Sequence, residues 1–133
     1  MLRHLQSYSV TRLFDTSGHL DFMMFQTSGT YNQITTSTTL SLNTWYHVAT
    51  VRSGTSFKLY VNGVQDASST ASGAVTNGTS SLSIGSNKDD GSYVFTGYIT
   101  DARVTKGTAL YTTNFVPSFS PLTATNNTSL LLN

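Results

Sequence analysis

Short apolar runs, each followed by a cluster of glycine, asparagine, serine or threonine, recur about every ten residues along this chain. This spacing is typical of an antiparallel sandwich or barrel rather than of alternating strands and helices. Serine (19 residues) and threonine (23 residues) are abundant, and only 10% of the residues are charged. Threonine suits a pleated strand, whereas the usual residues of exposed helix faces are scarce. We therefore predict one all-β domain over residues 1–133, built as a two-sheet antiparallel sandwich.

The apolar runs predict ten strands, at residues 8–14, 20–25, 33–36, 40–42, 45–52, 57–61, 64–66, 81–84, 93–104 and 130–132. In the strand at 57–61, alternate residues are apolar, which indicates that one face is buried and the other is not. Asn62 and Gly63 follow directly, and this pair favours the positive backbone angles of a type I′ turn. We expect Val64 to run back antiparallel to Val61.

The run at 93–104 changes its apolar phase near Thr100 and Asp101, which predicts a β-bulge there. Gly97 inside this run indicates that a bulky side chain or another backbone passes close by. A short helical turn is expected at 109–111. The three large apolar side chains that follow the run are expected to pin this part of the chain to the sandwich; they are Leu110, Tyr111 and Phe115.

Four stretches in this order resemble the laminin-G-like, concanavalin A-like family, in particular its members from phage and bacterial surface proteins. They are WYHVA at 45–49, LYVNG at 59–63, LSIG at 82–85 and GYITDARV at 97–104. The resemblance covers residues 18–122 and implies a jelly-roll sandwich in which Trp45 is buried in the core. Members usually begin with further strands, and that opening is missing from the resemblance. The strand at 130–132 then either pairs within its own domain or leaves a sheet edge open for another chain.

Carboxylate chemistry gives no support for catalysis. The family's glycoside hydrolases use a strand with two glutamates around an aspartate, because retaining cleavage needs a nucleophile and a separate acid/base. This chain has six aspartates and no glutamate. His47 is interpreted as a packed histidine rather than a catalytic one. We expect a protein that is not an enzyme.

The loop at 85–92 offers the best oxygen ligands for a hard cation. Asn87, Asp89 and Asp90 are the candidate Ca²⁺ ligands, and no other cofactor is expected. The alternative is a solvated hairpin turn, which asparagine, aspartate and glycine also favour. Tyr93 and Tyr98 flank this loop and its strand, so these five residues together form the candidate ligand-binding set.

Function is expected to be binding or assembly. The seven basic residues are scattered, so neither nucleic acid nor a membrane surface is an expected partner. The leading hypothesis is a carbohydrate- or surface-recognising adhesion module of a phage or microbial surface assembly, located on a virion or cell surface. The alternative is a purely structural subunit that binds no glycan. Its partners would be other protein subunits, including its own copies through an open sheet edge or the C-terminal strand.

Overall fold

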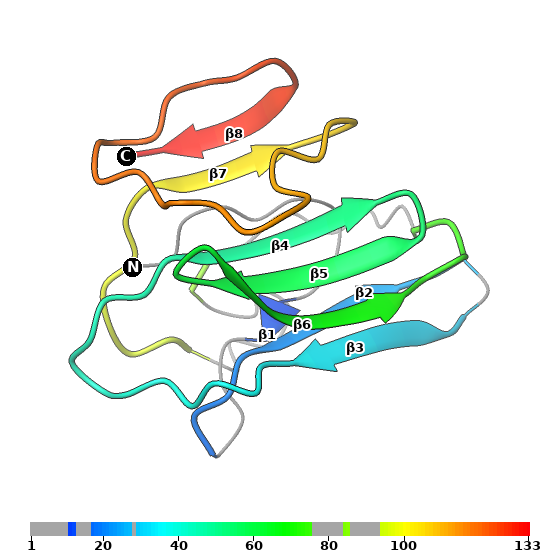
Figure 1. Ribbon diagram of the computed structural model, residues 1–133, viewed down its shortest axis with the longest axis horizontal. Coiled ribbons are helices and arrows are strands. Elements are labelled where there is room, and N and C mark those ends of the chain that lie inside the picture. The colour runs from blue at the N-terminus through cyan, green and yellow to red at the C-terminus, as the bar shows by residue number, and fades with distance from the viewer. Residues whose placement is uncertain (1–10, 13–16, 28, 76–83, 86–93) are drawn as a thin grey trace.

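The computed structural model describes the whole chain except residues 1–10, 13–16, 28, 76–83 and 86–93 (Figure 1). The described residues form eight strands and no helix, which confirms the all-β prediction. The strands are β1 (Thr11–Arg12), β2 (Asp21–Phe25), β3 (Tyr31–Thr35), β4 (Val48–Ser53), β5 (Ser56–Val61), β6 (Val64–Thr70), β7 (Ala102–Thr105) and β8 (Thr128–Leu132).

Two three-stranded antiparallel sheets, β1-β2-β3 and β4-β5-β6, enclose the main core. Every second side chain of β2 and β5 points inward, as the period of a strand requires. Phe22 and Phe57 meet across the two layers, with their ring centroids 4.6 Å apart. The buried core residues are Leu20, Phe22, Met24, Ile34, Leu40, Val48, Phe57, Leu59, Val61 and Ala71. The structure therefore has the predicted two-sheet sandwich architecture.

The hairpin between β5 and β6 forms as predicted. Val61 pairs with Val64, and the intervening Asn62 and Gly63 have φ angles of 50° and 80°. Both values are those of a type I′ turn, which matches the right-handed twist of the flanking strands. Because Val61 also pairs with Val48, the turn lies at one end of the sandwich, beside the start of β4 (Figure 1).

The outer face of the β4-β5-β6 sheet is covered by residues 108–117, which we call the strap. Ala109, Tyr111 and Phe115 of the strap pack against a second apolar cluster formed by Ala49, Val51 and Tyr60. The prediction that the strand at 57–61 exposes one face was therefore wrong for Tyr60, which is fully buried. Burial also raises the pKa of the Tyr60 phenol, because desolvation disfavours the phenolate.

Hydrogen bonds from β5 and β6 to the strap hold it in place. The Lys58 ammonium donates to the carbonyl of Thr112 over 2.7 Å, and the Gln65 N–H donates to Asn114 Oδ1 over 2.9 Å. The Phe115 N–H donates to the carbonyl of Gly63 over 2.9 Å. The predicted pinning of this segment by Tyr111 and Phe115 is thus confirmed. The predicted helical turn at 109–111 was wrong, because these anchors hold the chain in a non-helical path.

The predicted strand at 40–42 is not a strand, and the one at 45–52 begins only at Val48. Leu40 is in the core, but Leu42 is 91% exposed, and Asn43 has a φ angle of 57°. A positive φ at Asn43 turns the chain sharply and ends any extended run. The residues between Leu40 and Val48 therefore form a loop at the end of the sandwich.

The predicted strand at 93–104 is reduced to β7, which begins at Ala102. Asp101 has a φ angle of 54° and breaks the extended run, so the predicted bulge near Thr100 and Asp101 was wrong. The register shift lies between Val104 and Thr105 instead. The prediction for Gly97 is confirmed, because a Cβ atom there would lie 2.8 Å from Cε1 of Phe95.

The C-terminal strand β8 pairs antiparallel with β7 of the same chain. Of the two alternatives for residues 130–132, pairing within the chain is the one observed. Two further predicted strands, at 8–14 and 81–84, lie mostly outside the described residues. Within them, only Thr11 and Arg12 form the strand β1, and Ile84 lies in a bend.

Candidate ligand-binding surface

Of the five predicted ligand-binding residues, Tyr98 is the one that the structure describes. Asn87, Asp89, Asp90 and Tyr93 lie outside the described residues, and the predicted Ca²⁺ site lies there with them. Within the described part of the chain, no group of three or more acidic, histidine or cysteine side chains could hold a metal ion. The candidate surface is therefore built from Tyr98 and the residues that surround it.

Tyr98 and Trp45 form a pair of exposed aromatic rings. Tyr98 is 83% exposed and Trp45 is 54% exposed, and their ring centroids are 6.4 Å apart with the planes inclined by 39°. The prediction that Trp45 is buried was wrong. We call this pair the aromatic platform.

Trp45 points outward because its neighbour occupies the inward position. Tyr46 packs against the main core, and its hydroxyl accepts a hydrogen bond from the Ser41 N–H over 3.1 Å. This bond joins the beginning of the loop that precedes β4 to its end. Since Tyr46 fills the space over the core, the adjacent Trp45 is left on the surface.

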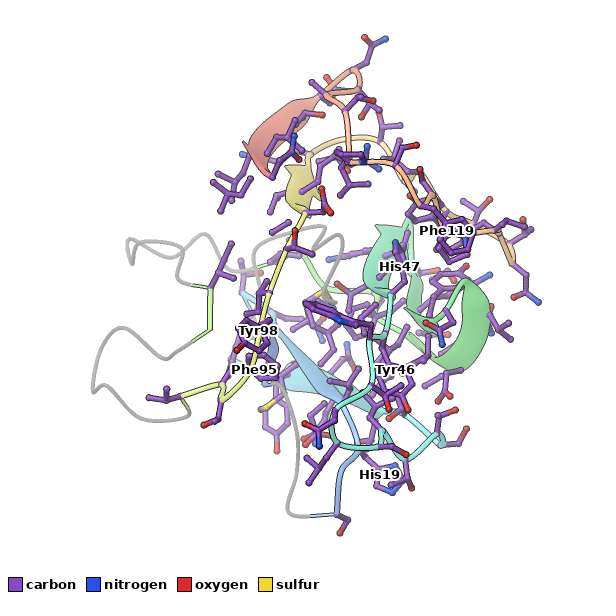
Figure 2. All side chains as sticks on the ribbon, turned by 90° about the vertical axis from the view of Figure 1, so that its left-hand side faces the viewer. His19, Tyr46, His47, Phe95, Tyr98 and Phe119 are labelled. Carbon is purple, nitrogen blue, oxygen red and sulfur yellow. The ribbon has the colours of Figure 1, made fainter. Side chains whose placement is uncertain are left out.

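Tyr98 points outward for the same reason. Its neighbour Ile99 packs against the main core, and Phe95 lies against Gly97. The Phe95 N–H also donates to the carbonyl of Gly85 over 2.7 Å. Figure 2 shows Phe95 and Tyr98 together on the segment that leads to β7, at the end of the sandwich that faces the viewer. The segment is therefore fixed on its inner side and presents Tyr98 on its outer side.

His47 lies two residues after Trp45, and its ring packs against the strap. Its backbone N–H donates to Asn62 Oδ1 over 2.9 Å, and its ring makes edge contacts with Tyr111 and Phe115 at centroid distances of 6.4 and 5.4 Å. The side chain is only 6% exposed. His47 is therefore packed, as predicted.

The described aspartates join segments of the fold. Asp21 accepts from the Thr35 hydroxyl over 2.5 Å, and Asp101 accepts from the Leu122 N–H over 3.2 Å. Asp66 of β6 accepts from the N–H groups and hydroxyls of Ser37 and Thr38, which lie two and three residues after the end of β3. Asp66 thereby links the two sheets. These contacts account for the three carboxylates as structural groups.

One pocket lined by described residues lies between the outer face of β4-β5 and the strap. It has a volume of about 150 Å³ and is lined by Val51, Ser53, Ser56, Lys58, Tyr111 and Thr112. Sites that enclose a small molecule usually measure about 300–1,000 Å³. The pocket is too small for a sugar chain, so the aromatic platform is the stronger candidate for ligand contact.

Sequence reasoning found Tyr98 but placed Trp45 on the wrong side of the surface. The sequence carried no local signal for Trp45, because β4 begins only at Val48 and strand alternation does not apply before it. A further finding concerns membranes: no helix among the described residues is both long and apolar enough to cross a bilayer.

Comparison with known families and proteins gave one match. The family model described as the concanavalin A-like lectin/glucanases superfamily matches residues 4–110 of this chain. This match begins closer to the N-terminus than the predicted limit of residue 18 and ends before residue 122. A search of curated proteins and a search of solved structures each found no match.

Proposed function

Because the chain belongs to the concanavalin A-like lectin/glucanases superfamily, we propose that it is a non-catalytic binding module that recognises carbohydrate through the aromatic platform. The observation that carries this proposal is the pair of exposed, neighbouring rings of Trp45 and Tyr98. The module acts in a phage or microbial surface assembly, on a virion or a cell surface.

Aromatic rings suit sugars for a physical reason. The face of an aromatic ring carries partial negative charge, and one face of a sugar ring presents weakly positive C–H groups. Trp45 and Tyr98 are inclined by 39°, so their faces form a shallow angle rather than a flat plane. Such a platform can contact one sugar ring from two sides, or two successive rings of a chain.

The absence of glutamate supports a non-catalytic role. Cleavage of a glycosidic bond needs two carboxyl groups, held about 5–9.5 Å apart across the bond. All six carboxylates of this chain are aspartates, and the three described ones make the structural contacts given above. Recognition without cleavage therefore accounts best for the chemistry of this chain. We also propose Asn87, Asp89 and Asp90 as ligands of a bound Ca²⁺ ion.

The test is a glycan array probed with the wild-type chain, with and without Ca²⁺, followed by calorimetry with the best-bound glycan. We expect Trp45→Ala and Tyr98→Ala each to weaken binding at least tenfold, or about 1.4 kcal/mol, as for aromatic anchors of other interfaces. Tyr98→Phe keeps the ring and should retain most of the affinity.

Phe119→Ala is the matched control, because Phe119 is 96% exposed and lies apart from the platform (Figure 2). At a protein concentration low enough to keep both chains monomeric, it should bind like the wild type. A chain that binds no glycan on the array, or platform variants that bind as tightly as Phe119→Ala, would overturn the proposal.

The second candidate function, a structural assembly subunit, is favoured by a different observation. Seven large apolar side chains are exposed at the end of the sandwich that carries the platform. A single sugar platform does not account for all of them.

A further inference from the structure

One end of the sandwich is unusually apolar on its surface. Seven large apolar side chains that are exposed in the described residues belong to four segments at this end: the loop before β4, the start of β6, the segment before β7, and the end of the strap with the residues that follow it. Figure 2 shows this end of the molecule. The seven residues, which we call the apolar rim, are Leu42 (91% exposed), Trp45 (54%), Val64 (57%), Val94 (67%), Tyr98 (83%), Val116 (86%) and Phe119 (96%).

The four segments of the apolar rim are joined by close contacts. The platform contact between Trp45 and Tyr98 connects the loop before β4 with the segment before β7. The loop before β4 meets the β5-β6 turn where the His47 N–H donates to Asn62 Oδ1 over 2.9 Å. The β5-β6 turn also meets the strap, because the Phe115 N–H donates to the carbonyl of Gly63. The four segments are therefore neighbours at this end of the sandwich.

The area of the apolar rim is large for a monomer. A fully exposed aromatic side chain shows about 150–250 Å², so the exposed parts of Trp45, Tyr98 and Phe119 together show roughly 350–600 Å², and the leucine and three valines add to this. The largest apolar patch of a typical monomer is about 300–600 Å². A stable protein interface needs about 800 Å² from each partner. With the four aliphatic side chains included, the exposed apolar area of these segments approaches what one partner contributes to a stable dimer.

The seven side chains also lack charged neighbours in the sequence. No residue adjacent in sequence to any of the seven is charged. Homodimer interfaces have such a composition, since their centres are apolar and depleted of charged residues. A second copy of these uncharged side chains meets no like-charge repulsion from them.

From this area and this lack of charge we propose that the apolar rim binds the same rim of a second copy of this chain, in a two-fold symmetric dimer. In such a dimer each patch contacts its own equivalent on the partner. Val116 and Phe119 contribute most to this dimer interface, because they are 86% and 96% exposed and follow Phe115, the point at which the strap meets the β5-β6 turn. The proposal does not depend on any sugar ligand.

The test is sedimentation velocity of the full chain over a wide range of concentrations. We expect a concentration-dependent dimer for the wild type, and a dissociation constant at least tenfold higher for the double variant Val116→Ser/Phe119→Ser. Both side chains are almost fully exposed, so the variant should keep its fold, and circular dichroism with thermal melting checks this. Glycan binding by the same variant provides a separate readout, since Trp45 and Tyr98 are unchanged.

The matched control is Phe25→Ser/Tyr31→Ser. These two aromatic side chains are also exposed and in contact, at the end of β2 and β3 away from the apolar rim (Figure 1). The control should dimerise like the wild type. A wild-type chain that stays monomeric at every concentration overturns the proposal. A dimer that survives Val116→Ser/Phe119→Ser but is lost when residues 130–133 are removed also overturns it, because the interface would then lie on β8.

Discussion

At the scale of single residues, the direction in which a side chain points is decided by its neighbours as much as by its own polarity. Trp45 is more apolar than Tyr46, yet Tyr46 lies over the core and Trp45 lies on the surface. The sequence alone does not show this choice, because β4 begins only at Val48 and the strand period does not apply before it. Tyr98 was predictable because it follows Gly97 and precedes an apolar residue that faces inward.

Gly63 is the residue at which backbone conformation and packing are most tightly coupled. Its φ angle is 80°, and a Cβ atom there would lie 1.9 Å from the carbonyl oxygen of Phe115 and 2.9 Å from Cδ of Pro117. Gly63→Ala therefore has two costs, about 1 kcal/mol for the left-handed backbone and about 1–3 kcal/mol for the displaced strap. We expect the free energy of unfolding to fall by about 3 kcal/mol, measured by urea denaturation.

Gly54→Ala is the matched control. Gly54 also has a positive φ angle, 58°, but nothing lies within 4 Å of the position that its Cβ would take. Its replacement should cost only the backbone contribution of about 1 kcal/mol. Equal losses for the two variants would mean that the strap does not hold its position against the β5-β6 turn.

At the scale of elements, features set by local signals could be predicted from the sequence, and features set by distant contacts could not. The β5-β6 hairpin was predictable because alternation and the Asn62-Gly63 pair both lie within a few residues. The late start of β7 at Ala102 was not, because the Asp101 carboxylate accepts a hydrogen bond from the N–H of Leu122, far along the chain. The family resemblance supplied the sandwich, whereas the path of the strap depends on contacts with Lys58 and Gly63 that no local pattern shows.

The strap is held chiefly by Phe115, and this can be measured. Phe115 stacks on Tyr111 at a centroid distance of 3.7 Å and makes edge contacts with His47 and Tyr60. Phe115→Ala removes this aromatic cluster and leaves a cavity above β4 and β5. We expect a loss of about 3 kcal/mol in the free energy of unfolding, as for other truncations of packed phenylalanine.

Phe119→Ala provides the comparison, because Phe119 lies four residues later and is 96% exposed. Its replacement should change the stability by less than about 0.5 kcal/mol. Thermal and urea denaturation of the two variants side by side make the measurement, at a protein concentration low enough to keep both monomeric. If Phe119→Ala proved the more destabilising of the two, the strap would not pack as described.

At the scale of the whole molecule, the aromatic platform is part of the apolar rim. The proposed dimer therefore covers Trp45 and Tyr98, the same rings that the proposed carbohydrate needs. Two events that use one surface exclude each other, and each must weaken the other by the same factor. The chain would then present its platform when sugar is abundant and conceal it in the dimer when sugar is scarce.

The effect of this competition on the dissociation constant of the dimer can be calculated. A glycan that binds one site on each monomer and none on the dimer raises the apparent dissociation constant of the dimer by the factor (1 + L/Kd)², where L is the free glycan concentration and Kd is the dissociation constant of the glycan. The factor is squared because each dimer that dissociates releases two platforms. At a glycan concentration ten times its own dissociation constant, the increase is about 100-fold. Sedimentation velocity with the best-bound glycan of the array measures it, and Tyr98→Ala, which is expected to bind that glycan poorly, should show a much smaller shift. If the glycan bound fully while the dimer stayed intact, the platform would have to remain open in the dimer, and the interface would be confined to the part of the rim around Val116 and Phe119.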